Sequence, residues 1–136
     1  MLILSTPIQA INLQTKMIKN LLLVGIGGFI GAVLRYLLYM LMKNNQPYLT
    51  TLLINIIGSL IIGIIISVSI KNGDFQNNYK LFFATGICGG FTTFSAFSLE
   101  NIQLLQEGKY LLSVGYILAS VILGILACFI GFKYSA

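Results

Sequence analysis

Charge is scarce in this chain of 136 residues. Asp, Glu, Lys and Arg together make up 8% of it, only three residues are acidic, and histidine is missing. A soluble domain would carry about 25% charged residues. The chain also has no nucleotide-binding loop and no set of a nucleophile with a nearby base. These absences argue against a soluble domain, an enzyme and an active pump.

Cysteine motifs and runs of basic residues are missing as well. Cys88 and Cys128 are far apart and lie in apolar stretches, so we interpret them as small buried packing residues and not as metal ligands. The net charge of +5 comes from lysines that are scattered singly, mostly in loops. They form no basic stripe of the kind that binds the phosphates of a nucleic acid. We therefore expect neither a nucleic acid nor a nucleotide as a partner.

Apolar residues dominate what is present. They make up 57% of the chain, and the mean hydropathy is +0.94. A helix needs about 20 apolar residues to cross the hydrocarbon core. Four stretches are long enough, and the loops between them are short: residues 18–42, 49–70, 80–105 and 109–134. The sequence thus predicts an all-α integral membrane protein with four transmembrane helices, a multi-pass protein of the cell membrane.

The first 16 residues do not resemble a fifth span. Pro7 and Gln9 interrupt them, and they lack the basic start of a signal peptide. We interpret residues 1–16 as a disordered or interfacial extension, with residues 17–136 as one transmembrane domain. Met17 is an alternative start, because the first span opens naturally there. The lysines and Arg35 divide five to three between the two sides of the membrane, so the charge bias favours one orientation only weakly.

The third stretch contains the most unusual segment, residues 86–98, which read Gly-Ile-Cys-Gly-Gly-Phe-Thr-Thr-Phe-Ser-Ala-Phe-Ser. Closely spaced glycines weaken a helix, and the hydroxyls of Thr92 and Thr93 compete for backbone groups. A helix break within a membrane is tolerated only beside a cavity, an ion or another protein surface. Its freed carbonyls suit cations, and its N–H groups attract anions. Phe94 and Phe97 follow on one face, where ordinary lipid or core packing is the alternative to a functional role.

Polar residues in the other stretches leave alternatives open. Arg35 lies near the end of the first span, where it either has a structural or orienting role or contacts an ion directly. Asn55 serves either as a hydrogen bond between helices or as a donor along a polar path. Tyr116, Ser120 and Gly124 repeat at intervals of four, which suits either helix packing or a wet track. Glycines at positions 27, 28 and 31 predict a close helix contact.

Three motifs in order resemble the fluoride channel family, Fluc or CrcB, from about Met17 to the end of the chain. They are Gly-Gly-Phe-Ile-Gly-Ala-Val-Leu-Arg-Tyr at 27–36, Thr-Leu-Leu-Ile-Asn-Ile-Ile-Gly-Ser at 51–59, and the segment 86–98. The resemblance implies an antiparallel homodimer with dual topology, two fluoride pathways, and a structural sodium ion at its centre. Main-chain carbonyls of Gly89 and Thr92 would bind the sodium.

The same resemblance assigns roles along the pathway. Phe94 and Phe97 would line it, Asn55 would donate to the anion, and Arg35 would lie near a vestibule or the interface. Tyr116 and Ser120 would belong to a polar track, and Ser95 adds a hydroxyl. Two positions depart from the family pattern. Ala96 stands where threonine is frequent, and Gly124 stands where some members have serine, so hydroxyls are missing at both.

Physical reasoning favours passive, gradient-driven fluoride export. Hydroxyl and amide donors can replace part of the water around fluoride, and the electropositive ring edges of phenylalanine can replace more. Two other functions remain as alternatives. A proton-coupled exporter of toxic cations would need a carboxylate in the first span, which has none. A non-transporting subunit would use the glycine faces only for assembly.

Overall fold

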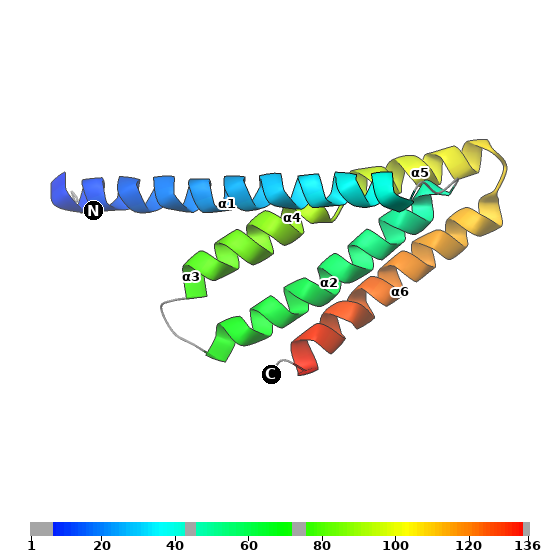
Figure 1. Cartoon of the computed structure of the whole chain (residues 1–136). Coiled ribbons are helices and arrows are strands. Elements are labelled where there is room, and N and C mark those ends of the chain that lie inside the picture. Colours follow the sequence, from blue (N-terminus) through cyan, green and yellow to red (C-terminus); the bar gives the residue numbers. More distant parts are fainter. Residues whose placement is uncertain (1–6, 43–45, 72–75, 135–136) are drawn as a thin grey trace, which may run out of the picture.

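The computed structural model describes residues 7–42, 46–71 and 76–134, and within these ranges the chain is helical, without strands. Its elements are α1 (Pro7–Met42), α2 (Pro47–Lys71), α3 (Gln76–Tyr79), η1 (Lys80–Cys88), α4 (Gly89–Phe91), α5 (Phe94–Gln106) and α6 (Tyr110–Tyr134) (Figure 1). Four spans are long and apolar enough to cross a membrane, and the third runs through α3, η1, α4 and α5. The prediction of an all-α, four-span membrane protein with an interrupted third span is confirmed.

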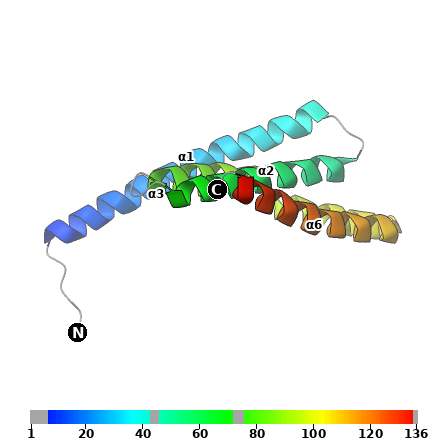
Figure 2. The ribbon, with the colours of Figure 1, turned by 90° about the horizontal axis from the view of Figure 1, so that it is seen from below.

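The spans lie side by side with little enclosed core. α1 packs mainly along η1 and α4, whereas α2 packs mainly along α6, so the first half of the third span lies between α1 and α2 (Figures 1 and 2). The few buried apolar residues are Ile54, Ala84, Cys88, Phe91, Leu104, Tyr116 and Ala127. Most large apolar side chains of the described residues are exposed, and they need lipid or another protein surface to cover them.

Glycines allow α1 and the third span to touch along their backbones. A β-carbon on Gly86 would lie 2.9 Å from Cα of Gly27, and one on Gly90 would lie 2.9 Å from Cα of Gly28. Such distances are too short for any side chain, so these helices pack at glycine-only separation. The close contact predicted for the first span is confirmed, and its partner is the third span.

The first helix begins earlier than expected. α1 starts at Pro7 and runs through Met17 without interruption, so the expectation of disorder is wrong for residues 7–16. Proline is tolerated in the first turn of a helix, and Pro7 stands at that position. Residues 1–6 lie outside the described part of the chain, as do 43–45 and 72–75, which carry part of the loop charge. An interfacial location for residues 7–16 and a start at Met17 stay predictions.

A tight turn joins α5 to α6. Gly108 has a φ of +73°, the left-handed conformation that glycine adopts without strain. The amide of Lys109 donates to the carbonyl of Leu104 at 2.9 Å, and the amide of Gly108 donates to that of Leu105 at 3.1 Å. This pattern closes the C-terminus of α5 and reverses the chain.

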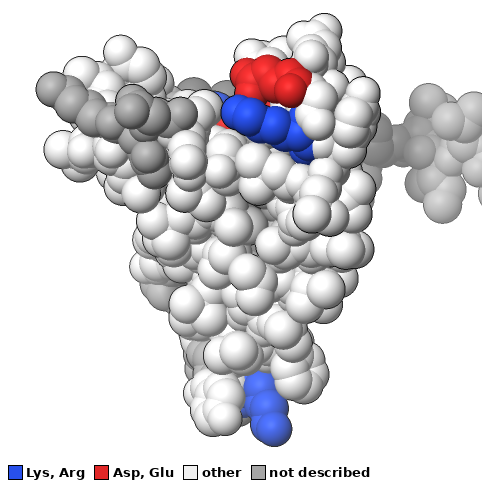
Figure 3. All heavy atoms as spheres, turned by 90° about the vertical axis from the view of Figure 1, so that its right-hand side faces the viewer, with Lys and Arg blue, Asp and Glu red and all other residues white. Residues whose placement is uncertain are grey.

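On the face of the molecule shown in Figure 3, charged side chains gather at the two ends, with an uncharged surface between them. At the α5–α6 turn, Lys109 forms an ion pair with Glu107 at 2.7 Å. The hydrogen bond that the Lys109 ammonium donates to Glu107, together with the negative charge of Glu107, raises the pKa of Lys109 above its ordinary value. The distribution suits a molecule whose middle is in hydrocarbon and whose ends are in water.

Candidate ion pathway at the interrupted helix

The third span leaves helical geometry at Thr92 and Thr93. Thr92 has φ −73° and ψ 156°, and Thr93 has φ −149° and ψ 117°, so both are extended. The predicted break is therefore confirmed, but it falls on the threonines. Gly86, Gly89 and Gly90 stay helical within η1 and α4, where Gly86 and Gly90 serve the contact with α1. The π-helical winding of η1 was not predicted, and the sequence offers no signal for it.

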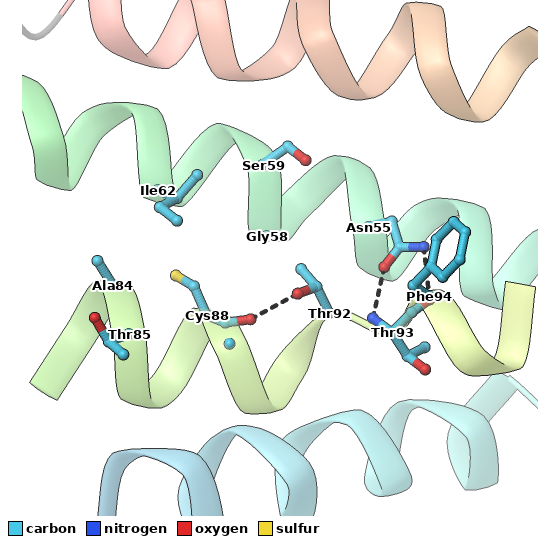
Figure 4. Close-up of a pocket in the computed structure, with 11 residues that line it drawn as sticks. Asn55, Gly58, Ser59, Ile62, Ala84, Thr85, Cys88, Thr92, Thr93 and Phe94 are labelled. Carbon is cyan, nitrogen blue, oxygen red and sulfur yellow. Dashed lines mark hydrogen bonds between the residues drawn. The ribbon is translucent and has the colours of Figure 1, made fainter. Parts of the chain in front are cut away.

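Asn55 of α2 holds the break in place. Its Nδ2 donates to the carbonyl of Thr93 at 3.1 Å, and its Oδ1 accepts from the amide of Thr93 at 2.9 Å (Figure 4). One side-chain amide thus supplies both partners that the extended backbone lost when it left the helix. The hydrogen-bond role between helices is the one the structure shows. The second hydrogen of the amide is not used in these bonds, so donation to an anion stays a prediction.

The break frees carbonyls at the end of α4. In a continuous helix the carbonyl of Gly89 would accept from the amide of Thr93, which donates to Asn55 instead. The carbonyl of Thr92 would accept from the amide of Ala96, which donates to the hydroxyl of Thr93 at 3.3 Å. Gly89 and Thr92 therefore offer hard oxygen donors of the kind that bind sodium, and their chemistry fits the predicted cation site.

Arg35 contacts the carbonyl that lies between these two. Its Nε donates to the oxygen of Gly90 at 3.2 Å, and its side chain is half-buried. A cation near the C-terminal end of a helix also interacts favourably with the helix dipole. The structural role expected as one alternative for Arg35 is thus seen directly, whereas contact with an ion stays a prediction.

A groove of about 500 Å³ runs in front of the break. Asn55, Thr92, Thr93 and Phe94 line one end of it, and Gly58, Ser59, Ala84, Thr85, Cys88 and Gly89 line the rest (Figure 4). A β-carbon on Gly89 would meet no atom within 4 Å, so this glycine faces open space. The freed backbone therefore borders a cavity, as a break within a membrane requires.

Aromatic rings extend from the groove along α5 to α6. Phe94 is 77% exposed, and its ring centroid lies 5.5 Å from that of Phe97. Phe97 in turn lies 5.0 Å from Tyr116 at an interplanar angle of 61°, so one ring meets the other edge-on. Tyr48 of α2 lies 5.6 Å beyond Tyr116. We call Phe94, Phe97, Tyr116 and Tyr48 the aromatic row. The structure thus brings three predicted site residues together in it.

The hydroxyl groups near this row differ in their hydrogen bonding. The Ser95 hydroxyl lies 3.3 Å from that of Thr93, which lines the groove. The Ser120 hydroxyl is buried on α6 and has no hydrogen-bond partner among the described residues. At Gly124 a β-carbon would lie 3.7 Å from the hydroxyl of Ser59, so α2 places a hydroxyl beside the position where serine is missing. At Ala96 the nearby hydroxyl is that of Thr93, which accepts from the Ala96 amide at 3.3 Å.

A buried carboxylate closes the far end of the row, and sequence reasoning missed its importance. Glu100 is 8% exposed; it accepts from Thr51 Oγ1 at 2.5 Å and from Tyr116 OH at 2.8 Å. The Tyr39 hydroxyl lies 2.6 Å from that of Thr51. One signal in the sequence could have indicated its place: Glu100 follows Phe97 by three residues on one helix, so the two side chains lie on the same face. The described residues contain no cluster of three His, Cys, Asp or Glu side chains that could hold a metal.

Comparisons with known proteins agree on one family. A family model described as CrcB-like protein, Camphor Resistance (CrcB), matches residues 22–132. A protein of Azobacteroides pseudotrichonymphae named fluoride-specific ion channel FluC is 48% identical over 120 residues, which cover 85% of this chain and 95% of the relative. A protein of the same name from Leptospira interrogans is 44% identical, with 83% and 91% covered. Another from Mesorhizobium japonicum is 49% identical, with 82% and 92% covered.

Proposed function

Because the chain belongs to the CrcB-like family, whose similar relatives are named fluoride-specific ion channels, we propose that it conducts fluoride passively across the membrane. The resemblance seen in the sequence motifs is thereby confirmed. A fluoride channel is not an enzyme, and its four spans make it a multi-pass protein, in bacteria of the plasma membrane.

The aromatic row beside the helix break is the observation that carries the proposal. Fluoride holds its water strongly, so a pathway must offer partners that replace this water without binding too tightly. Ring edges of Phe94 and Phe97 carry partial positive charge and suit this need. The Ser95 hydroxyl and the remaining N–H of Asn55 add donors at the groove, and Ser120 adds a buried hydroxyl on α6.

Glu100 sets a condition on this pathway. The hydroxyl protons of Tyr116 and Thr51 point at its carboxylate. An anion that reaches Tyr116 must therefore compete with Glu100 for the same donors, which limits how tightly the anion is held. Conduction needs an ion to leave as easily as it enters, and this competition supplies the weakening.

The proposal includes an antiparallel homodimer with two pathways and a central sodium ion. The freed carbonyls of Gly89 and Thr92 support it, because they lie beside an open groove and one chain provides too few oxygens to surround a cation. Carbonyls of two copies would complete the set. Sodium would contribute positive charge that stabilises a nearby anion and satisfies the interrupted backbone. The weak lysine bias also suits a chain that inserts in both orientations.

Fluoride efflux from liposomes that contain the purified protein tests the function. We expect release down the fluoride gradient without any other energy source, and little release of chloride from matched liposomes. No fluoride release from properly folded protein would refute the channel. Fluoride release that requires an opposing proton gradient would indicate a coupled exporter instead.

Phenylalanine substitutions separate a channel from an assembly subunit. We expect Phe97→Ile to reduce fluoride flux at least tenfold while the protein still assembles, because isoleucine fills the space without a ring edge. Phe129→Ile is the matched control, since Phe129 is 60% exposed on α6 and lies outside the aromatic row. Equal flux in both variants would remove Phe97 from the pathway.

A further inference from the structure

A second, polar cleft lies between the N-terminal part of α1 and the start of the third span. It measures about 780 Å³. Three lysines line it, Lys16, Lys19 and Lys80, together with asparagines that include Asn20 and Asn78. The acids among the described residues, Glu100 and Glu107, belong to the far part of the third span. Within the described chain, the cleft is therefore cationic and lined by amides.

The α1 side of this cleft is one face of a helix. Positions 12, 15, 16, 19 and 20 line it, and this spacing of three and four brings them to one side. Met17, Ile18 and Leu21 lie on the opposite side and are 57%, 56% and 64% exposed. The beginning of α1 is thus amphipathic, with its polar face turned to the third span. This arrangement is typical of helices that lie at a membrane surface.

The length of α1 places the cleft at the level of lipid headgroups. Its 36 residues extend for about 54 Å, whereas the hydrocarbon core is about 30 Å thick. The predominantly apolar part, residues 21–42 with Arg35 as its one charged residue, accounts for about 33 Å of this length. Lys19 and Lys80 each stand just before an apolar run. Figures 1 and 2 show the N-terminal part of α1 continuing past the start of the third span.

The amides of the cleft have hydrogen-bonding capacity to spare. Asn20 and Asn78 are half-buried, and neither side chain makes a hydrogen bond to another described residue. Each amide group can donate two N–H bonds. Three ammonium groups and free amide donors around one cavity match the chemistry of a phosphate group, and basic pockets between transmembrane helices bind anionic lipid headgroups.

We propose that the cleft between α1 and the start of the third span binds the phosphate headgroup of an anionic phospholipid, held by Lys16, Lys19 and Lys80 and by the amides of Asn20 and Asn78. The acyl chains lie on the exposed apolar side chains beside it. A lipid is favoured over free phosphate because the cleft adjoins apolar surface at the headgroup level. Lys16, Lys19 and Asn20 lie outside residues 22–132, which match the family model, so the α1 side of the site is not implied by membership of the family.

Native mass spectrometry of the full chain, loaded with phosphatidylglycerol or cardiolipin and compared with phosphatidylcholine, tests the proposal. Each lysine near a membrane surface contributes about fivefold to affinity for anionic lipid. We expect the triple variant Lys16→Gln, Lys19→Gln, Lys80→Gln to bind the anionic lipid about a hundredfold more weakly. Lys133→Gln, which removes a lysine at the end of α6, is the control and should bind as the parent does. Should the triple variant fail to fold, Lys19→Gln alone should show the fivefold loss.

Three results would overturn the proposal. Unchanged lipid binding in the lysine variants would exclude the cleft, and an equal loss in Lys133→Gln would reduce the effect to general surface charge. Displacement of the lipid by millimolar inorganic phosphate would make this a free-anion site. Asp74 is near Lys80 in sequence but outside the described residues, so Asp74→Asn is included and should not weaken binding. None of these outcomes depends on fluoride flux, which is measured separately in phosphatidylcholine liposomes.

Discussion

Replacing Asn55 with alanine removes the amide that holds the helix break. The backbone N–H and carbonyl of Thr93 then both lose their partner, and they are poorly placed to find another, because Thr93 is only 7% exposed. An extended backbone at this depth cannot recover a helical bond without rebuilding the whole segment. We therefore expect Asn55→Ala to loosen the break itself as well as to lower stability.

The expected loss follows from two opposing estimates. A buried polar group left without a partner costs about 1–3 kcal/mol, so two groups set an upper limit of about 6 kcal/mol. Hydrogen bonds between membrane helices average only about 0.6 kcal/mol, because the unfolded chain in the membrane also finds partners. Two such bonds set a lower limit of about 1.2 kcal/mol. Asn55→Ala also enlarges the groove beside Thr93, where a water molecule could take up part of the lost bonding, so we expect the free energy of unfolding to fall by about 2 kcal/mol, in the lower part of this range.

Asn101→Ala is the matched control. Asn101 lies on α5, in the same span as the break; it donates to the carbonyl of Phe97 at 2.8 Å and accepts from the Ser113 hydroxyl at 2.8 Å. The two substitutions thus remove the same atoms and the same number of hydrogen bonds. Unfolding in mixed micelles should give similar losses for both. Amide hydrogen exchange across residues 92–96 should accelerate only in Asn55→Ala. The same exchange rates in both variants would refute the claim that Asn55 holds the break in place.

Substitutions at four further positions probe the same region. Gly90→Ala should destabilise the fold by about 1–3 kcal/mol, because its β-carbon would overlap the backbone of Gly28. At Gly89 a β-carbon meets open space, so Gly89→Ala should unfold like the parent. If cross-linking shows a reduced dimer population in Gly89→Ala alone, a partner subunit covers Gly89. Arg35→Lys keeps the charge but removes the Nε donor to the carbonyl at position 90, so it should lose about 1 kcal/mol in the same unfolding titration, and no loss would mean that the charge alone suffices. Glu100→Gln offers one acceptor oxygen in place of two, and we expect a loss of about 1–3 kcal/mol together with altered fluoride flux; unchanged flux would separate the carboxylate from conduction.

Most of the fold could be predicted because lipid imposes simple rules. Four apolar stretches of sufficient length, and one of them interrupted, were visible in the composition and spacing alone. The extent of α1 was not, because an amphipathic segment lacks the apolar composition by which a span is recognised. The position of the break was also misjudged slightly. Glycine propensity pointed to positions 86–90, yet close packing against α1 keeps those glycines helical, and the extended residues are Thr92 and Thr93.

The sequence indicated which residues of the candidate site lie together better than which hydrogen bonds they form. Phe94, Phe97 and Tyr116 come together as one row, although they are up to 22 positions apart in sequence. The partners of Asn55 and Arg35 are backbone groups, and any residue carries those, so the sequence contains no mark of them. Glu100 was undervalued for a related reason. Its significance comes from Thr51 on α2 and Tyr116 on α6, which only the packing of the spans brings to it.

The division of the third span has a mechanical consequence. Its first half is fixed to α1 by glycine contacts, and its second half is fixed to α6 by the turn at Gly108. The freed carbonyls belong to the first half and the phenylalanine rings to the second. Rotation about the backbone torsions of Thr92 and Thr93 would therefore move the freed carbonyls relative to the phenylalanine rings, because these two residues join the halves. We expect a substitution within one half to leave the helical geometry of the other half unchanged.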